Sequence, residues 1–102
     1  MSRFEQLQKL VAQSPDDPMT HYVLGLEFAN QERWDEAIAA YDRALEVDCN
    51  YIAAYYHKAR AEIRGGWRES AVGTLRAGQV AARAVGDEKT WAEMQDLAET
   101  IA

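Results

Sequence analysis

Residues 21–45 read HYVLGLEFANQERWDEAIAAYDRAL and carry the clearest structural pattern in the chain. Its apolar residues recur at steps of three and four, which is the period of one face of an α-helix. The polar run Gln31-Glu32-Arg33 divides the stretch into two helical segments. Because two helices joined by so short a link lie antiparallel and side by side, the stretch predicts a helical hairpin.

The hairpin pattern returns when the chain is aligned with itself at an offset of 34 residues. Small residues then fall on small ones and large apolar residues on large ones, in the pairs Gly25/Ala59, Ala37/Ala71, Tyr41/Leu75 and Ala44/Gly78. Small side chains let two helix axes approach closely, while a bulky side chain on the next turn fills the space beside them. A single hairpin cannot bury its apolar face alone, so the repeat predicts hairpins stacked into a solenoid.

Helical periodicity extends along the whole chain. Pro15 and Pro18 interrupt it early, and glycines at 65–66 and 86 stop it later. No stretch alternates with period two for long enough to predict a strand. We therefore expect an all-α protein of about six helices, at roughly 3–13, 19–31, 34–48, 51–64, 67–86 and 88–102.

The spacing of small and large apolar residues within the hairpins resembles the tetratricopeptide repeat, in the pattern His21-x-x-Leu24-Gly25-x-x-Phe28 followed by Ala37-x-x-x-Tyr41-x-x-Ala44. The resemblance implies antiparallel helix hairpins wound into a right-handed superhelix. It divides the single domain 1–102 into a half repeat 1–17, a repeat 18–51, a repeat 52–86 and a capping helix 87–102. The positions that it implies for packing between helices are Leu24, Gly25, Phe28, Ala37, Tyr41, Ala44, Ala59, Ala71 and Leu75.

Two charged residues in the second repeat depart from the family pattern. Lys58 and Glu62 stand where apolar residues are usual. We expect Ile63 to rotate inward in place of Glu62. The stem of Lys58 is expected to lie along apolar surface with its ammonium group in water.

The composition narrows the function. A net charge of −6 disfavours a general affinity for nucleic acid or anionic membranes. Residues 52–86, however, hold six basic and two acidic side chains between acidic flanks, which suits either an acidic partner or a solvated helix face. No stretch approaches the roughly 20 apolar residues of a membrane span. With Cys49 as the single cysteine, no internal disulfide is expected, and we expect a cytoplasmic protein.

The sequence contains no recognisable catalytic or metal-binding motif. His21 and His57 are isolated from any cysteine, and Cys49 lacks an activating neighbour. Gly65-Gly66 is not followed by the Lys-Ser/Thr of a phosphate-binding loop. We therefore expect no catalytic activity, no metal and no cofactor.

The family resemblance also implies a binding surface. In tetratricopeptide repeats the first helix of each repeat lines a concave groove that holds an extended peptide, and the matching positions here are Met19, Tyr22, Leu26, Asn30, Tyr56, Arg60 and Arg64. Tyr and Arg are enriched at binding hot spots. Arg60 and Arg64 are one turn apart, so both guanidinium groups can meet one carboxylate or phosphate. The alternative is that the tyrosines pack the hairpins and the arginines pair with local glutamates.

These observations favour a module that binds an unidentified protein or peptide, acidic in character, in the concave groove. Some family members clamp a chaperone's C-terminal carboxylate with Lys and Asn, but Tyr22 and Leu26 occupy those places here, which disfavours that ligand. One alternative is a self-assembling scaffold that uses its solenoid ends, through Trp67, Trp91 or the half repeat. A weaker alternative is nucleic-acid contact through the basic middle segment, with Arg60, Arg64, Arg68, Arg76 and Arg83.

Overall fold

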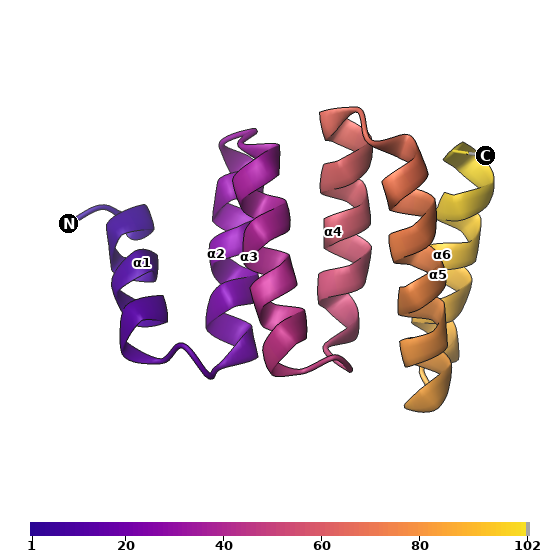
Figure 1. Cartoon of the computed structure of the whole chain (residues 1–102), viewed down its shortest axis with the longest axis horizontal. Coiled ribbons are helices and arrows are strands. Elements are labelled where there is room, and N and C mark those ends of the chain that lie inside the picture. Colours follow the sequence, from indigo (N-terminus) through magenta and orange to yellow (C-terminus); the bar gives the residue numbers. More distant parts are fainter. Residues whose placement is uncertain (102) are drawn as a thin grey trace.

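The computed structural model describes residues 1–101, and within this range it contains six α-helices and no strand (Figure 1). The helices are α1 (Arg3–Gln13), α2 (Pro18–Asn30), α3 (Trp34–Val47), α4 (Ile52–Gly65), α5 (Arg68–Ala84) and α6 (Glu88–Ile101). The all-α prediction is confirmed, and the predicted helix ends agree to within about two residues. Residue 102, at the end of the predicted capping helix, lies outside the described residues.

Local chemistry explains where these helices begin and end. The Asp17 side chain accepts a hydrogen bond of 2.9 Å from the backbone N–H of Met19, and Pro18 occupies the first turn, where its missing N–H costs nothing. Gly66 and Gly86 adopt left-handed backbone angles, with φ of 93° and 76°. A side chain is disfavoured at such angles, so these glycines terminate α4 and α5.

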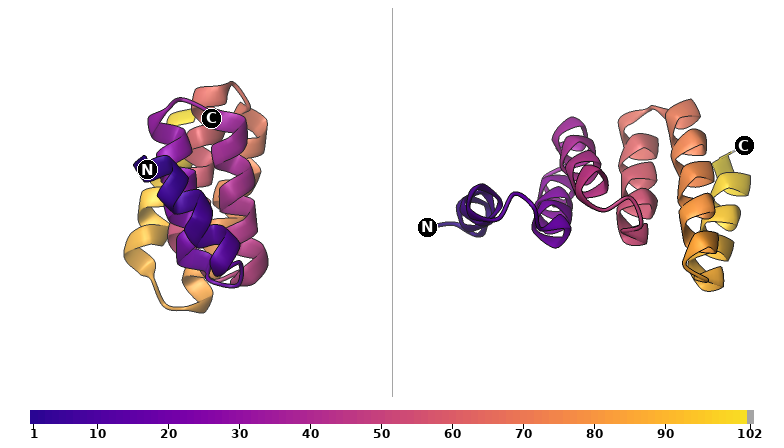
Figure 2. Two further views of the ribbon diagram at one scale, coloured as in Figure 1. Left: turned by 90° about the vertical axis from the view of Figure 1, so that its left-hand side faces the viewer. Right: turned by 60° about the horizontal axis from the view of Figure 1, so that its bottom comes forward.

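The helices form a row of antiparallel neighbours. The pairs α2/α3 and α4/α5 are hairpins that stack through α3 and α4, while α1 packs on α2 and α6 packs on α5. Helices α1 and α6 lie at opposite ends of the row, as two further views also show (Figures 1 and 2). The molecule is accordingly elongated, measuring 41 × 29 × 18 Å. No helix within residues 1–101 is long and apolar enough to cross a membrane.

Two clusters of buried side chains hold the row together. Tyr41 is at the centre of the first, and Leu75 and Met94 are at the centre of the second. A Cβ atom added to Gly25 would overlap the ring of Tyr41. The buried positions include Leu24, Gly25, Phe28, Ala37, Tyr41, Ala44, Ala59, Ala71 and Leu75.

The two charged residues in α4 do not behave alike. Glu62 is itself buried, and the hydroxyl of Thr74 donates a 2.6 Å hydrogen bond to its Oε1. The expectation that Ile63 would replace it was wrong, because α5 supplies a hydrogen-bond donor that makes the buried carboxyl tolerable. The stem of Lys58 is largely covered, and its ammonium group binds Asp42 at 2.7 Å instead of facing water alone.

Candidate functional site

Helices α2, α3 and α4 line a hollow of about 400 Å³, and Leu97 of α6 is also part of the lining. Four of the seven predicted contact residues line it, namely Leu26, Asn30, Arg60 and Arg64. A second hollow of about 310 Å³ lies between α4 and α6 and is lined by Tyr56 and Arg60, among others. We call the two hollows together the inner groove.

Arg60 lies where the two hollows meet. It lines both of them, and its guanidinium group lies 5.8 Å from the centre of the Tyr56 ring. The side chain is exposed, and no carboxylate of residues 1–101 lies within 4.0 Å of its nitrogens. A cation stacked on an aromatic ring and lacking a carboxylate partner is well placed to bind an anionic group.

Arg64, one turn further along α4, is partly engaged within the chain. Its guanidinium lies 5.2 Å from the Trp34 ring centre and 3.9 Å from Glu32 Oε1. Both charged side chains are more than 60% exposed, so the pair contributes little to stability. The alternative of local pairing therefore describes Arg64 but not Arg60.

Tyr22 belongs to an aromatic cluster beside the groove. Its ring centre lies 5.3 Å from that of Tyr51, 5.6 Å from that of His57 and 6.0 Å from that of Tyr41. Burial raises the pKa of the Tyr22 hydroxyl above its ordinary value. Tyr22 therefore packs the wall between the hairpins, in keeping with the alternative interpretation of the tyrosines.

Met19 stays outside the groove. It is 54% exposed near the start of α2 and lines neither hollow. The structure thus brings five of the predicted contact residues to the inner groove and leaves Met19 and Tyr22 at its margins.

His57 is a groove residue that the sequence analysis missed. It lines both hollows and contacts the rings of Tyr22 and Tyr56. Burial, and then the nearby charge of Arg60, lower the pKa of its imidazole. At neutral pH the ring is therefore uncharged and offers one hydrogen-bond donor and one acceptor. The sequence could have indicated this position, because His57 is three residues from Arg60 and residues at that spacing share one face of a helix.

The groove also receives residues from helices outside the predicted set. Trp34 comes from the start of α3 and Leu97 from α6. No spacing within one helix predicts their position, because it depends on how the helices pack together.

Within residues 1–101, the remaining histidine and cysteine side chains are not grouped into a metal site. The described residues contain no group of three or more His, Cys, Asp or Glu side chains arranged to hold a metal ion. Cys49 is an exposed free thiol in the turn after α3. His21 is buried, and its Nε2 lies 2.7 Å from the carbonyl oxygen of Pro15, a hydrogen bond that accounts for the burial of this polar ring.

Comparison with known proteins agrees with this architecture. The tetratricopeptide repeat family model matches residues 18–48. A solved tetratricopeptide repeat domain protein from Salinibacter ruber is 30% identical, with 85% of this chain and 88% of that one covered and a TM-score of 0.79. The chain belongs to the tetratricopeptide repeat family. This confirms the resemblance drawn from the pattern around Gly25.

Other solved members of the family are also similar to this tetratricopeptide repeat chain. The TPR2B domain of yeast Sti1, solved in a complex with pHsp70, is 26% identical, with 96% of this chain and 78% of that one covered and a TM-score of 0.90. The protein BPP2914 from Bordetella parapertussis is 26% identical, with 99% and 88% covered and a TM-score of 0.84.

Among curated proteins, the chain is similar to ER membrane protein complex subunit 2 of Xenopus tropicalis, at 32% identity over 91 residues. The aligned region covers 89% of this chain, which spans about 30% of the length of that relative. The tetratricopeptide repeat is generally a non-catalytic protein-interaction fold, and the comparisons support a protein-interaction module.

Proposed function

We propose that the inner groove binds an extended segment of a partner protein that carries an acidic side chain, and that the chain acts without catalysis. The observation that carries this proposal is Arg60. It is an exposed cation at the junction of two hollows, stacked on Tyr56. No carboxylate of residues 1–101 lies within 4.0 Å of its nitrogens, although Asp87 and Glu93 also line the second hollow. An acidic side chain docked at this point would form a charge-assisted hydrogen bond, which is among the stronger polar contacts in proteins.

The mixed lining of the groove suits an extended segment. An extended chain presents unpaired backbone N–H and C=O groups that need partners. The Asn30 amide and the neutral His57 ring supply both donors and acceptors, while Leu26, Trp34 and Leu97 supply apolar contact. Such a lining resembles other peptide sites, where a few polar groups orient a ligand over an apolar surface.

The similar proteins support a protein segment as ligand. The Sti1 domain was solved with pHsp70. In this chain Tyr22 and Leu26 stand where the Lys and Asn of a terminal-carboxylate clamp are expected, and Tyr22 is packed into the wall. We therefore propose an internal acidic side chain as the group recognised at Arg60, in place of a chain terminus.

The positions of the basic residues favour a protein ligand over nucleic acid. Arg60 and Arg64 line the inner groove, whereas Arg76 bonds to Gln95 and Arg83 stacks on Trp91. The basic middle segment is thus divided between α4 and α5 and their different neighbours. Binding to a phosphate backbone usually draws on several cations along one track.

The test uses a library of random 12-residue peptides displayed on phage and selected on the immobilised chain. We expect the selected peptides to be enriched in Asp and Glu. Arg60→Ala should weaken binding of a selected peptide, measured by fluorescence anisotropy, by about 10-fold or more, because a hydrogen bond to a charged group contributes about 1.5–3 kcal/mol.

Arg68→Ala is the matched control for this experiment. Arg68, at the start of α5, is an exposed arginine like Arg60, but it lines neither hollow of the inner groove. Its replacement should leave peptide affinity unchanged. Selected peptides without acidic enrichment, or equal affinities for wild type and Arg60→Ala, would contradict the proposal.

A further inference from the structure

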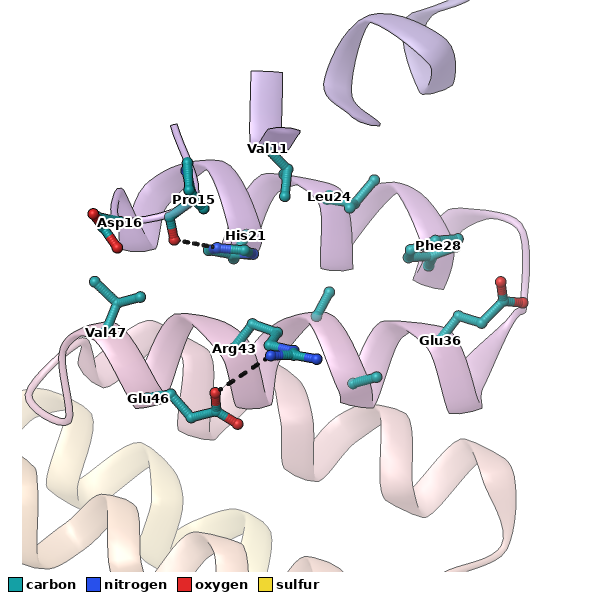
Figure 3. A pocket seen from close by; sticks show the side chains of 12 residues that line it. Val11, Pro15, Asp16, His21, Leu24, Phe28, Glu36, Arg43, Glu46 and Val47 are labelled. Atoms are coloured by element: carbon teal, nitrogen blue, oxygen red, sulfur yellow. Dashed lines mark hydrogen bonds and ion pairs between the residues drawn. The ribbon is translucent and has the colours of Figure 1, made fainter. Parts of the chain in front are cut away.

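A larger hollow, of about 900 Å³, lies on the other side of α2. Its floor is formed by Leu24 and Phe28. These side chains point away from the groove residues Leu26 and Asn30, because residues two positions apart in an α-helix are rotated by about 200° about its axis. Its walls are α1, through Val11, and α3, through Ala40 and Val47 (Figure 3). We call this hollow the outer groove.

The outer groove suits a helix as occupant. Its apolar floor and walls come from helices whose backbone groups are already paired within each helix. An extended segment laid there would leave its own N–H and C=O groups without partners, whereas a helix satisfies them internally. The part of α3 that forms the wall runs from Glu36 to Val47, which is about 16 Å at 1.5 Å per residue.

Three of the four charged residues that line the outer groove are acidic, and one of them, Glu36, is paired with Arg33 at 2.6 Å. Asp16 and Glu46 lie near Val47 at one end of it (Figure 3). Arg43 approaches Glu46 only at 3.7 Å with both side chains about two-thirds exposed, so it neutralises that carboxylate weakly. Residues 1–51 together hold ten acidic and four basic side chains. The occupant is therefore expected to carry basic groups beside its apolar face.

Such a face exists on the chain itself, along the exposed side of α5. Val80 is 74% exposed at its centre, and Gly73, Ala77 and Ala84 share its side of the helix at steps of three and four. These residues span 12 positions, again about 16 Å of helix. A bare apolar surface of this length on a solvent-facing helix has no partner within residues 1–101.

Two arginines lie along one side of this surface, the side toward α6. Arg76 donates hydrogen bonds to Gln79 and Gln95, and Arg83 stacks on Trp91 at 4.5 Å. No carboxylate of the described chain lies within 4.0 Å of either guanidinium group. They are thus held in place beside Val80 with their positive charges unneutralised.

We propose that the exposed face of α5 in one copy of the chain packs into the outer groove of a second copy. The two surfaces have similar lengths, both contain apolar residues, and their charges are opposite in sign. The small residues around Val80 allow the helix axes to approach, and Arg76 and Arg83 lie opposite the acidic rim. The contact leaves the inner groove open, so it is separate from peptide binding.

This arrangement joins two different surfaces, and each copy keeps one free groove or one free α5 face after a contact forms. Such head-to-tail contacts extend into longer assemblies unless the geometry closes a ring. A single helix in a groove buries a small area, so the association is expected to be weak and visible only at high protein concentration.

Sedimentation equilibrium tests the proposal. We expect the weight-average mass to rise above the monomer value of 11.5 kDa at concentrations of about 0.1–1 mM, in the range of weak, small interfaces. Added salt should reduce the association, because exposed charges are screened. Val80→Glu on the helix, or Ala39→Lys in the groove, should each weaken it by about 10-fold or more. The first sets a carboxylate against the acidic rim, and the second sets an ammonium group against Arg76 and Arg83.

A mixing experiment distinguishes this contact from general stickiness. Val80→Glu retains an intact groove and Ala39→Lys retains an intact α5, so an equimolar mixture of the two variants should form 1:1 pairs that neither forms alone. Val85→Glu and Ala92→Lys, at exposed positions outside both surfaces, are the controls and should associate like wild type.

Three results would overturn the proposal. The first is a wild-type chain that stays at 11.5 kDa up to about 1 mM, beyond the range of weak specific contacts. The second is association that neither Val80→Glu nor Ala39→Lys weakens. The third is a mixture of the two variants that remains monomeric. Circular dichroism of each variant, expected to match wild type, shows that the fold is retained.

Discussion

Replacing Gly25 by alanine tests the closest approach between the helices of the first hairpin. The added Cβ would overlap the ring of Tyr41, which is 1% exposed and bordered by Tyr22 and His57. The ring also lines the inner groove, and a shift toward that hollow would cost its contacts with Tyr22 and His57. Gly25→Ala should therefore destabilise the fold although alanine is the better helix former.

The magnitude follows from two opposing effects. Overpacking a filled core costs about 1–3 kcal/mol. Because Tyr41 is almost fully buried, we expect the cost of Gly25→Ala to lie near the upper end of this range. Alanine in place of glycine within a helix contributes about 1 kcal/mol of stability. The net loss is about 2 kcal/mol, which corresponds to a fall in Tm of about 8–16 °C for a domain of this size.

Gly73→Ala is the matched comparison. Gly73 also lies inside a helix, but no atom lies within 4 Å of its added Cβ, so only the gain in helix propensity applies. We expect it to stabilise the chain by about 0.5–1 kcal/mol. Urea denaturation followed by circular dichroism, at a concentration where the chain is monomeric, measures both variants. If Gly25→Ala were as stabilising as Gly73→Ala, the proposed packing of Gly25 on Tyr41 would be refuted.

Two further predictions concern the dependence of stability on pH. Burial raises the pKa of Glu62, so the folded state holds this proton more tightly than the unfolded chain, and Glu62 should lower stability as pH rises above the ordinary glutamate value. Glu62→Gln keeps an acceptor for Thr74 and should flatten that decline in urea midpoints measured from pH 4 to 8; an unchanged slope would contradict it. Burial and Arg60 lower the pKa of His57, so stability should be complete above the ordinary histidine pKa of about 6.5 and fall as pH drops below it. His57→Gln should remove this fall between pH 7 and 5, and a fall of equal size in the variant would show that another group causes it.

The arrangement of buried groups explains why part of the site escaped the sequence analysis. Ile63 was expected to replace Glu62 because a charged side chain stands there where the family pattern has an apolar one. Thr74, twelve residues later on α5, supplies a hydrogen bond to the buried carboxyl group. Trp34 and Leu97 enter the inner groove for the same kind of reason, since each comes from a helix that only packing brings to α4.

Six helices, the prolines and glycines at their ends, and the 34-residue register that places small residues at equivalent positions of the two hairpins were all predictable from the amino-acid sequence. These features are predictable because helical periodicity states which side of each helix faces inward. Helical periodicity does not predict the distance between neighbouring helices or how far each helix is rotated about its axis relative to its neighbours. The packing of the helices is therefore the reason that Arg60 lacks a carboxylate partner within 4.0 Å while Arg64 has one, and that α1 and α3 border a second groove.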